Sequence, residues 1–212
     1  LWSISGLHNT LCLATDFSEG ESIVTPIVGP QNGLLELIEW IDGSQTSLQI
    51  QLYQMQEANL VQALLDALNR GVNVELMLDP GCYNCNIWSE TDLQYKNDYA
   101  YTLIQAGATV YEFNTNSNEP YLYLHSKVVV RDSNSIWMSS GNWKPSSVPA
   151  PDVRGNVEWS VIIDNDDLAQ MVEQQFNLDK EFAELMALND YDQYQFYPPG
   201  SIGGGGVPSA IQ

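Results

Sequence analysis

Long apolar runs are missing from this sequence of 212 residues. No run of about 18 apolar residues occurs, so the sequence predicts no membrane-spanning helix. No basic-then-apolar leader opens it either, and we expect that any signal peptide has been removed. The length suffices for one domain of the larger sort with a substantial core.

Positive charge is scarce. The sequence has 7 Lys and Arg against 27 Asp and Glu, which gives a net charge of −20. Nucleic-acid-binding proteins usually carry a basic stripe, and a negative surface slows the approach of a polyanion. Adaptation to a salty environment, where screening is strong, fits this composition better than an acidic surface tuned for a basic partner. Four of the cations fall within 28 residues, at Lys127, Arg131, Lys144 and Arg154.

Cysteine is also sparse and occurs only as Cys12, Cys82 and Cys85. Cys82 and Cys85 form a single C-x-x-C, and a zinc site would need two further ligands, for which Cys12 and His8 are the candidates. A thioredoxin-like role lacks its usual context, because a Pro-Gly pair in a loop precedes the C-x-x-C. We expect a structural disulfide among the three, which favours an exported setting, secreted or at the cell surface.

Chemically active side chains gather in one stretch of the sequence. His125 and Lys127 lie two residues apart in the run 122–130, which is rich in β-branched and aromatic residues and predicts a strand. Residues two apart on a strand share a face, so the two side chains should point the same way. The positive charge of the chain is therefore concentrated beside a histidine.

A hairpin is expected to return the chain to this histidine. Residues 132–135 have the composition of a turn, and 136–140 predict a second strand. This return would place Asn142 beside His125. A base or nucleophile, a fixed cation and an amide donor on one patch suit a phosphate ester undergoing substitution.

The spacing of these residues resembles the phospholipase D superfamily. The signature of that family is H-x-K, four residues, D, six residues, and G-S-x-N. The residues that match it are His125, Lys127, Asp132, Ser140 and Asn142. Ser139 departs from it and stands where the family has its first Gly. The early part of the chain also looks like the start of such a domain. It contains a Val-Thr-Pro segment, a predicted helix and a Leu-Gln-Ile-Gln-Leu-Tyr strand.

The resemblance implies covalent catalysis with no metal ion and no other cofactor. One His attacks phosphorus and forms a phosphohistidine, while a second His protonates the leaving oxygen. Water or another alcohol then resolves the intermediate, with the second His acting as base.

The resemblance also implies which side chains are catalytic: His125, Lys127, Asn142 and Glu158. Lys127 and Asn142 would hold the nonbridging oxygens as charge builds in the transition state. Glu158 belongs to an Asn-x-Glu and would accept the Nδ1 proton of His125, which orients Nε2 for attack.

Three further positions have supporting roles. Ser140 would contact the substrate through its hydroxyl. Lys144 would bind substrate from the Pro- and Ser-rich stretch 143–155, for which a solvent-exposed connection is the alternative. Asp132 is expected at the hairpin turn, where its role is structural.

A regular α/β rhythm surrounds the motif. Apolar periodicity predicts helices at 34–41, 60–68 and 91–106 and one starting at 164–167, and strands at 23–28, 48–53, 72–78, 109–113 and 156–163. Alternating elements with short joints that end in Gly indicate parallel crossovers. We therefore expect an α/β fold with a mixed, largely parallel β-sheet flanked by helices on both faces.

Residues 23–190 would form the phospholipase D-like catalytic domain, 1–22 an extended N-terminal segment, and 191–212 a flexible Pro/Gly-rich tail or linker.

The implied mechanism needs two H-x-K units, and the sequence contains one. The other histidine, His8, lacks a Lys two residues further on. Either two chains pair about a two-fold axis, each giving one motif to a shared site, or this chain is one repeat of a longer protein. We favour the homodimer, because a compact single-motif length is typical of the dimeric nucleases of the family.

Three functions compete. The leading one is a metal-independent phosphodiesterase that hydrolyses a phosphodiester through a phosphohistidine, as a nuclease does. The second is a phospholipase D or phosphatidyltransferase that acts on lipid, although no basic amphipathic helix supports membrane binding. The third is a non-catalytic binding or assembly domain, and the intact set of His125, Lys127, Ser140 and Asn142 argues against it.

Overall fold

The structure is a computed structural model, and it describes residues 22–81, 90–115, 121–187 and 198. The three cysteines, His8, and nearly all of the predicted N-terminal segment and tail fall outside these ranges. In the described part, no helix is both long enough and apolar enough to cross a bilayer.

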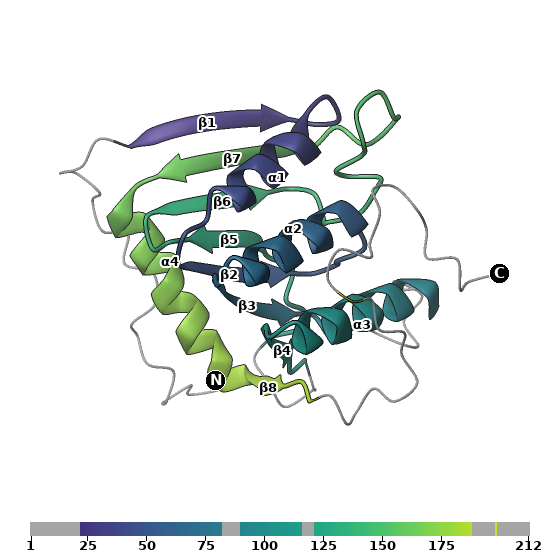
Figure 1. Cartoon of the computed structure of the whole chain (residues 1–212), viewed down its shortest axis with the longest axis vertical. Helices are drawn as coiled ribbons and strands as arrows, with labels where there is room; N and C mark the ends of the chain where they lie inside the picture. The colour runs from purple at the N-terminus through teal and green to yellow at the C-terminus, as the bar shows by residue number, and fades with distance from the viewer. Residues whose placement is uncertain (1–21, 82–89, 116–120, 188–197, 199–212) are drawn as a thin grey trace, which may run out of the picture.

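The described residues form eight strands, four α-helices and one short 3-10 helix (Figure 1). The strands are β1 (Ile23–Val28), β2 (Ser47–Leu52), β3 (Asn73–Leu78), β4 (Thr109–Phe113), β5 (Lys127–Arg131), β6 (Ser135–Ser139), β7 (Trp159–Asp164) and β8 (Ala183–Leu185). The helices are α1 (Gly33–Asp42), α2 (Ala58–Asn69), α3 (Glu90–Gln105) and α4 (Asp166–Asp179), and the 3-10 helix is η1 (Lys180–Phe182).

All eight strands form one sheet with the order β1-β7-β6-β5-β2-β3-β4-β8. The pairings β2–β3 and β3–β4 are parallel, and the other five are antiparallel. The predicted α/β fold with a mixed sheet is confirmed, but antiparallel pairings outnumber parallel ones, contrary to the largely parallel sheet we expected. In the described part, the neighbouring strands that a helix connects are β2–β3 and β3–β4, and these two pairs are parallel. The hairpin β5–β6 and the strands β7, β1 and β8 add antiparallel neighbours.

Helices cover both faces of the sheet. Figure 1 looks onto the face that α1, α2 and α3 cover. The main hydrophobic core lies under them, and its largest fully buried side chains include Trp137, Trp143, Tyr99, Leu37 and Leu64. On the opposite face, α4 packs Ala169, Leu168 and Val172 against Val130, Ile136 and Ile163.

Local sequence signals account for most element boundaries. Pro26 lies in β1, an edge strand, as its missing N–H predicted. The turns after α2 and α3 contain Gly71 and Gly107, whose φ angles of 89° and 105° are in the region that glycine adopts readily. At the start of α4, the side chain of Asn165 accepts the N–H of Leu168 at 2.8 Å. The predicted strand at 156–163 begins later, at β7, so Glu158 lies just before the strand.

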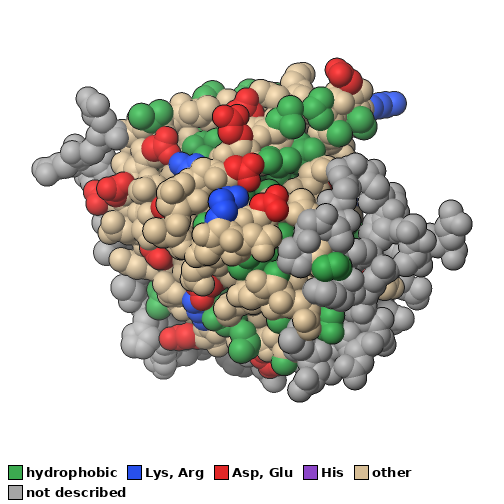
Figure 2. Space-filling view, in the orientation of Figure 1, with side chains coloured by type: hydrophobic (Ala, Val, Ile, Leu, Met, Phe, Trp, Pro, Cys, Tyr) green, Lys and Arg blue, Asp and Glu red, His purple; other side chains and the backbone are tan. Residues whose placement is uncertain are grey.

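Acidic side chains are prominent on the face that carries α1 and α2 (Figure 2). Glu39, Asp42 and Asp66 are exposed there, and Arg70 lies 3.6 Å from Asp42. An ion pair this exposed adds little stability. The surface is therefore negative on the side of the sheet away from α4.

Candidate active site

The motif residues lie at one end of the strands, on the right in Figure 1, where β2 ends and β5 and β7 begin. Lys127 is the first residue of β5 and is buried, whereas His125 precedes the strand and is exposed. The predicted strand at 122–130 therefore starts five residues late. The reason is that the N–H of Leu124 donates to the Asp79 carboxylate at 2.8 Å and makes no ladder bond.

Lys127 and His125 are in direct contact. The Nζ atom of Lys127 lies 3.0 Å from Nδ1 and 3.4 Å from Nε2 of His125, and it donates to the His125 carbonyl at 2.7 Å. The Tyr53 ring packs against the imidazole with their centroids 4.6 Å apart, and the ammonium lies 5.5 Å from the centre of the same ring. This pair places an exposed nitrogen nucleophile directly against a buried cation.

The surroundings of the two groups shift their proton affinity. Partial burial, and then the charge of Lys127, lower the pKa of His125, while the charge of Asp79 raises it. Burial also lowers the pKa of Lys127, and the charge of Glu158 opposes this shift. A lowered pKa of His125 favours the neutral imidazole, the form in which a ring nitrogen has a free lone pair.

Asn142 is held by the segment that follows β2, which also contains Tyr53, the residue that packs on His125. Its Nδ2 donates to Gln54 Oε1 at 2.9 Å, and the next residue, Trp143, bridges to Met55. The Trp143 carbonyl accepts the N–H of Gln56 at 2.7 Å. An amide NH₂ has two N–H groups, so the second N–H of Asn142 can serve a substrate oxygen.

Glu158 pairs with Ser140 in this structure. The Ser140 hydroxyl donates to Glu158 Oε2, and Asn156 Nδ2 donates to Oε1 at 3.4 Å. Among the described hydrogen bonds, none joins Glu158 to His125, its predicted partner. A Cβ on Gly141 would lie 2.8 Å from Glu158 Cδ, so the residue between Ser140 and Asn142 must be small. In the family signature G-S-x-N this position is x, where any residue is allowed.

Ser139, the departure from the family signature, supports the turn with its hydroxyl. It accepts the N–H of Gly141 at 3.0 Å and lies 3.0 Å from the hydroxyl of Ser160. A glycine would offer neither contact.

The loop after Asn142 is firmly packed: Ser147 and Val148 are buried, and the N–H of Val148 donates to the carbonyl of Lys144. The stretch 143–155 is thus partly buried, and the part of Lys144 in substrate binding stays a prediction.

Asp132 lies at the hairpin turn, where its φ of 53° is in the left-handed region that Asp tolerates better than most residues. Its Oδ1 accepts the N–H groups of Thr46 at 2.7 Å and Ser47 at 3.0 Å, and also the Thr46 hydroxyl at 2.8 Å. Oδ2 accepts the N–H of Gln45 at 3.0 Å. Burial alone would raise the pKa of Asp132, but these hydrogen bonds together lower it.

Replacement of Asp132 by alanine is expected to lower the free energy of unfolding by about 2 kcal/mol at neutral pH, because the start of β2 loses a charged acceptor. A lowered folded pKa stabilises the fold above the unfolded pKa of about 3.9, and this contribution is lost as pH falls through the folded value. Urea denaturation at pH 7 and pH 3 measures both effects. Asp132→Asn is the matched control and should lose less. Equal stability of wild type and Asp132→Ala at pH 7 would contradict the structural role.

Three contributors to the site were not identified from the sequence: Asp79, Tyr53 and Gln54. Asp79 follows the parallel strand β3, and the carboxyl ends of such strands are where ligands usually bind, so its position was the available signal. Tyr53 and Gln54 follow β2 at the same edge. Their roles depend on which strands are neighbours, and the sequence pattern does not give that information.

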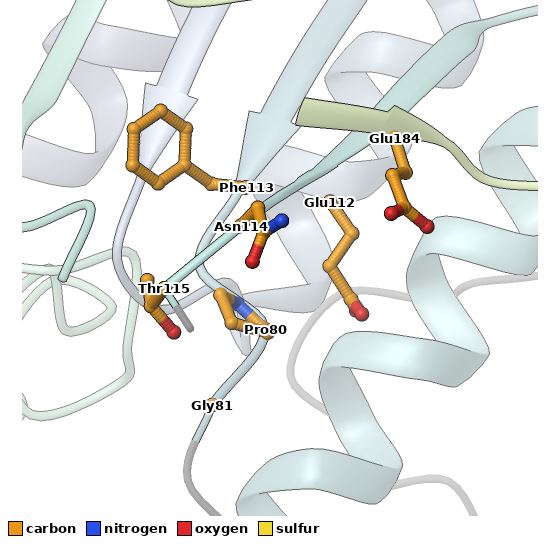
Figure 3. Close-up of a pocket in the computed structure, with 7 residues that line it drawn as sticks. All are labelled: Pro80, Gly81, Glu112, Phe113, Asn114, Thr115 and Glu184. Carbon is orange, nitrogen blue, oxygen red and sulfur yellow. The ribbon is translucent and has the colours of Figure 1, made fainter. Parts of the chain in front are cut away.

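A pocket of about 280 Å³ lies nearby, at the carboxyl ends of β3 and β4 (Figure 3). Its lining residues are Pro80, Gly81, Glu112, Phe113, Asn114, Thr115 and Glu184. None of them belongs to the H-x-K motif, so the pocket is separate from the His125 patch. Within the described ranges, no group of three or more His, Cys, Asp or Glu side chains is placed to hold a metal ion.

Comparison with known proteins places the chain among related sequences and folds. Residues 37–180 match the family described as cardiolipin synthase, PLD-like domain. Nuc, a phospholipase D family member from Salmonella typhimurium, is 20% identical with a TM-score of 0.63, over 78% of this chain and 99% of that one. NucT from Helicobacter pylori is 18% identical with a TM-score of 0.61, over 78% of this chain and 100% of that one.

A third solved structure is longer than this chain. Phosphatidylserine synthase from Haemophilus influenzae is 17% identical with a TM-score of 0.62, and the match covers 84% of this chain and 43% of that one. At these identities the likeness shows a shared fold. No curated protein sequence gave a significant match.

Proposed function

The chain belongs to the phospholipase D superfamily, and we propose that it is a metal-independent phosphodiesterase that hydrolyses a nucleic-acid-like phosphodiester through a phosphohistidine at His125. The observation that carries this proposal is the contact between the exposed His125 and the buried Lys127, 3.0 Å apart where β2 ends and β5 begins. Asn142 is held by Gln54, the neighbour in sequence of Tyr53, which packs on His125. The similarity in fold to Nuc and NucT over nearly their whole length supports the nuclease-like form.

The proposed reaction is a double displacement at phosphorus. The neutral His125 attacks through Nε2, the bond between phosphorus and the leaving oxygen breaks, and a second histidine protonates that oxygen. Water then attacks the phosphohistidine, the second histidine takes its proton, and His125 is released. Lys127 and Asn142 stabilise the charge that builds on the nonbridging oxygens, and Ser140 adds a hydroxyl.

Glu158 orients His125 in this scheme. In the structure its carboxylate bonds Ser140 and acts electrostatically on Lys127. We propose that substrate binding draws the ammonium toward the phosphate, which would leave Nδ1 of His125 free to donate to Glu158. Catalytic hydrogen bonds often tighten only when substrate is bound.

The second histidine must come from elsewhere, and we propose a second copy of this chain. An apolar strip of the sheet supports this homodimer. The strip lies on the α4 face beyond the helix, and we call it the open face: Val24, Met138, Val161 and Trp159. Val24, Met138 and Trp159 are 55%, 43% and 62% exposed. Exposed apolar surface of this kind typically marks an interface, and Trp159 is bonded to Ser140 at the site.

Lipid is the second candidate substrate. Leu122 and Tyr123, just before His125, are 81% and 40% exposed and offer apolar contact to an acyl chain. The similarity to a phosphatidylserine synthase points the same way. A longer chain that carries a second repeat is the corresponding alternative to the homodimer.

Cleavage in excess EDTA tests the function. We expect the protein to cleave single-stranded DNA and a chromogenic phosphodiester, with rates unchanged by EDTA, and to leave phosphatidylcholine vesicles intact. Activity on the vesicles alone would establish the lipid alternative. A substrate panel that stays uncleaved, with and without added divalent metal, would indicate a non-catalytic binding or assembly domain.

A further inference from the structure

A buried carboxylate lies directly behind the segment that carries His125. Asp79 follows β3 and is 1% exposed. Its Oδ2 accepts the N–H of Leu124 at 2.8 Å, its Oδ1 accepts the N–H of Gly81 at 2.9 Å, and its own N–H donates to the Leu52 carbonyl at 3.1 Å. Asp79 therefore connects the end of β2, through its backbone N–H, and the residue before His125, through its carboxylate.

A buried ammonium lies beside the backbone of Asp79. The Lys96 side chain on α3 is 2% exposed, and its Nζ donates to Glu112 at 2.7 Å and to the Pro80 carbonyl at 2.9 Å. The same atom lies 3.5 Å from the carbonyl of Asp79 itself. Burial raises the pKa of Asp79, while its two backbone hydrogen bonds and the charge of Lys96 oppose that shift. A deeply buried charge is costly unless it is compensated. The Asp79 carboxylate accepts two backbone N–H groups, and the charge of Lys96 acts on it although that ammonium forms its ion pair with Glu112.

We propose that Asp79 is a positioning residue for His125. Its carboxylate fixes His125 through the backbone N–H of Leu124, and its negative charge stabilises the cationic forms of the imidazole. This role rests on the phosphohistidine mechanism proposed above. When Nε2 of His125 bonds to phosphorus and the leaving oxygen departs with a proton, the ring retains its Nδ1 proton and becomes cationic. Lys127, 3.0 Å from the ring, opposes that charge. The charge of Asp79 compensates it alongside Glu158, which accepts the Nδ1 hydrogen bond in the mechanism proposed above.

The groups that contact His125 or act on it electrostatically come from three parts of the sheet. Lys127 belongs to β5, Tyr53 follows β2 and Asp79 follows β3. Glu158 acts on Lys127, and His125 is affected by Lys127 and Asp79. Asp79 is thus the acidic group that counters Lys127 at the imidazole.

The test compares Asp79→Asn with wild type in two measurements. Loss of the charge is expected to lower the pKa of His125, measured by NMR titration of the imidazole proton. The sequence has two histidines, so the spectrum of His125→Ala assigns the signal. The same variant should lower kcat by about 10- to 100-fold with little change in KM, because the nucleophile is misplaced.

Glu75→Gln is the matched control. Glu75 lies on β3, the strand that Asp79 follows, and its carboxylate pairs with Lys180 at 3.0 Å. It does not contact the His125 segment, so both measurements should stay at wild-type values. Asp79→Glu separates the two roles: it keeps the charge and the pKa of His125 but still lowers kcat. If Asp79→Asn does not fold, Asp79→Glu decides the question through kcat. A pKa and a kcat that both match wild type in a folded variant would overturn the proposal.

The two proposals can fail separately. The NMR titration needs no substrate, so the link between Asp79 and His125 is measurable in a protein that cleaves nothing. An inactive wild type would overturn the proposed function, and an unshifted His125 pKa would overturn the link.

Discussion

Replacement of His125 by alanine is expected to lower kcat/KM for phosphodiester cleavage by at least about 10³-fold, because the chain loses the nucleophile on which both chemical steps depend. The substitution should leave the fold intact. His125 is exposed, lies outside the strands, and its ring packs mainly on Tyr53. The loss is therefore chemical, and a thermal unfolding curve close to that of wild type would confirm it.

Trapping of the intermediate separates nucleophilic catalysis from base catalysis. We expect wild type quenched in denaturant during turnover to carry a substrate-derived phosphoryl group on His125, with the acid lability of a phosphohistidine. Peptide mass spectrometry locates that group. His8→Ala is the control and should retain both activity and label, because His8 lacks a lysine two residues further on. A His125→Ala protein that still cleaves substrate would overturn the mechanism.

The sequence predicted those parts of the fold that depend on local chemistry. Apolar periodicity identified α1, whose buried residues Leu34, Leu37 and Ile41 recur every three or four positions. Gly71 and Gly107 marked the ends of α2 and α3, because helices commonly end where the chain turns through a positive φ. The spacing of His125 and Lys127 predicted their shared face, and their side chains are in contact.

Features that depend on distant partners could not be predicted in this way. A strand pattern does not encode the direction of its neighbours, so the antiparallel majority of the sheet was missed. The late start of β5 follows from a hydrogen bond between Leu124 and Asp79, which are 45 positions apart. The contact of Glu158 with Ser140 depends on the close approach of Gly141, a position that the motif leaves open.

The scarcity of cations constrains the mechanism. With a net charge of −20, the protein repels a polyanion at long range, and the attraction must come from short-range contacts. Lys127 is buried and paired with His125, so it stabilises charge at the reaction centre rather than attracting substrate from a distance. A second copy of the chain would double the number of such cations at a shared site.

If the proposed homodimer forms, replacement of Trp159 by aspartate is expected to dissociate it and to abolish the proposed activity along with it. Trp159 is 62% exposed on the open face, so its loss should cost the isolated fold little. A buried charge at a dimer interface should weaken association by about 2–4 kcal/mol, which is about 30- to 1,000-fold in Kd. Sedimentation at micromolar concentration measures the change. Leu185→Asp is the matched control, since Leu185 is a strand residue that is also 62% exposed, on β8 at the opposite end of the sheet.

Mixing experiments then show whether the two copies share one site. If each active centre needs His125 from both chains, activity after subunit exchange follows the square of the wild-type fraction. Equal amounts of wild type and His125→Ala should then retain about a quarter of the activity, whereas independent sites would retain about half. A Trp159→Asp protein that stays dimeric would exclude the open face as the interface. A fully active wild-type monomer would exclude the homodimer and require both proton transfers to be made within one chain.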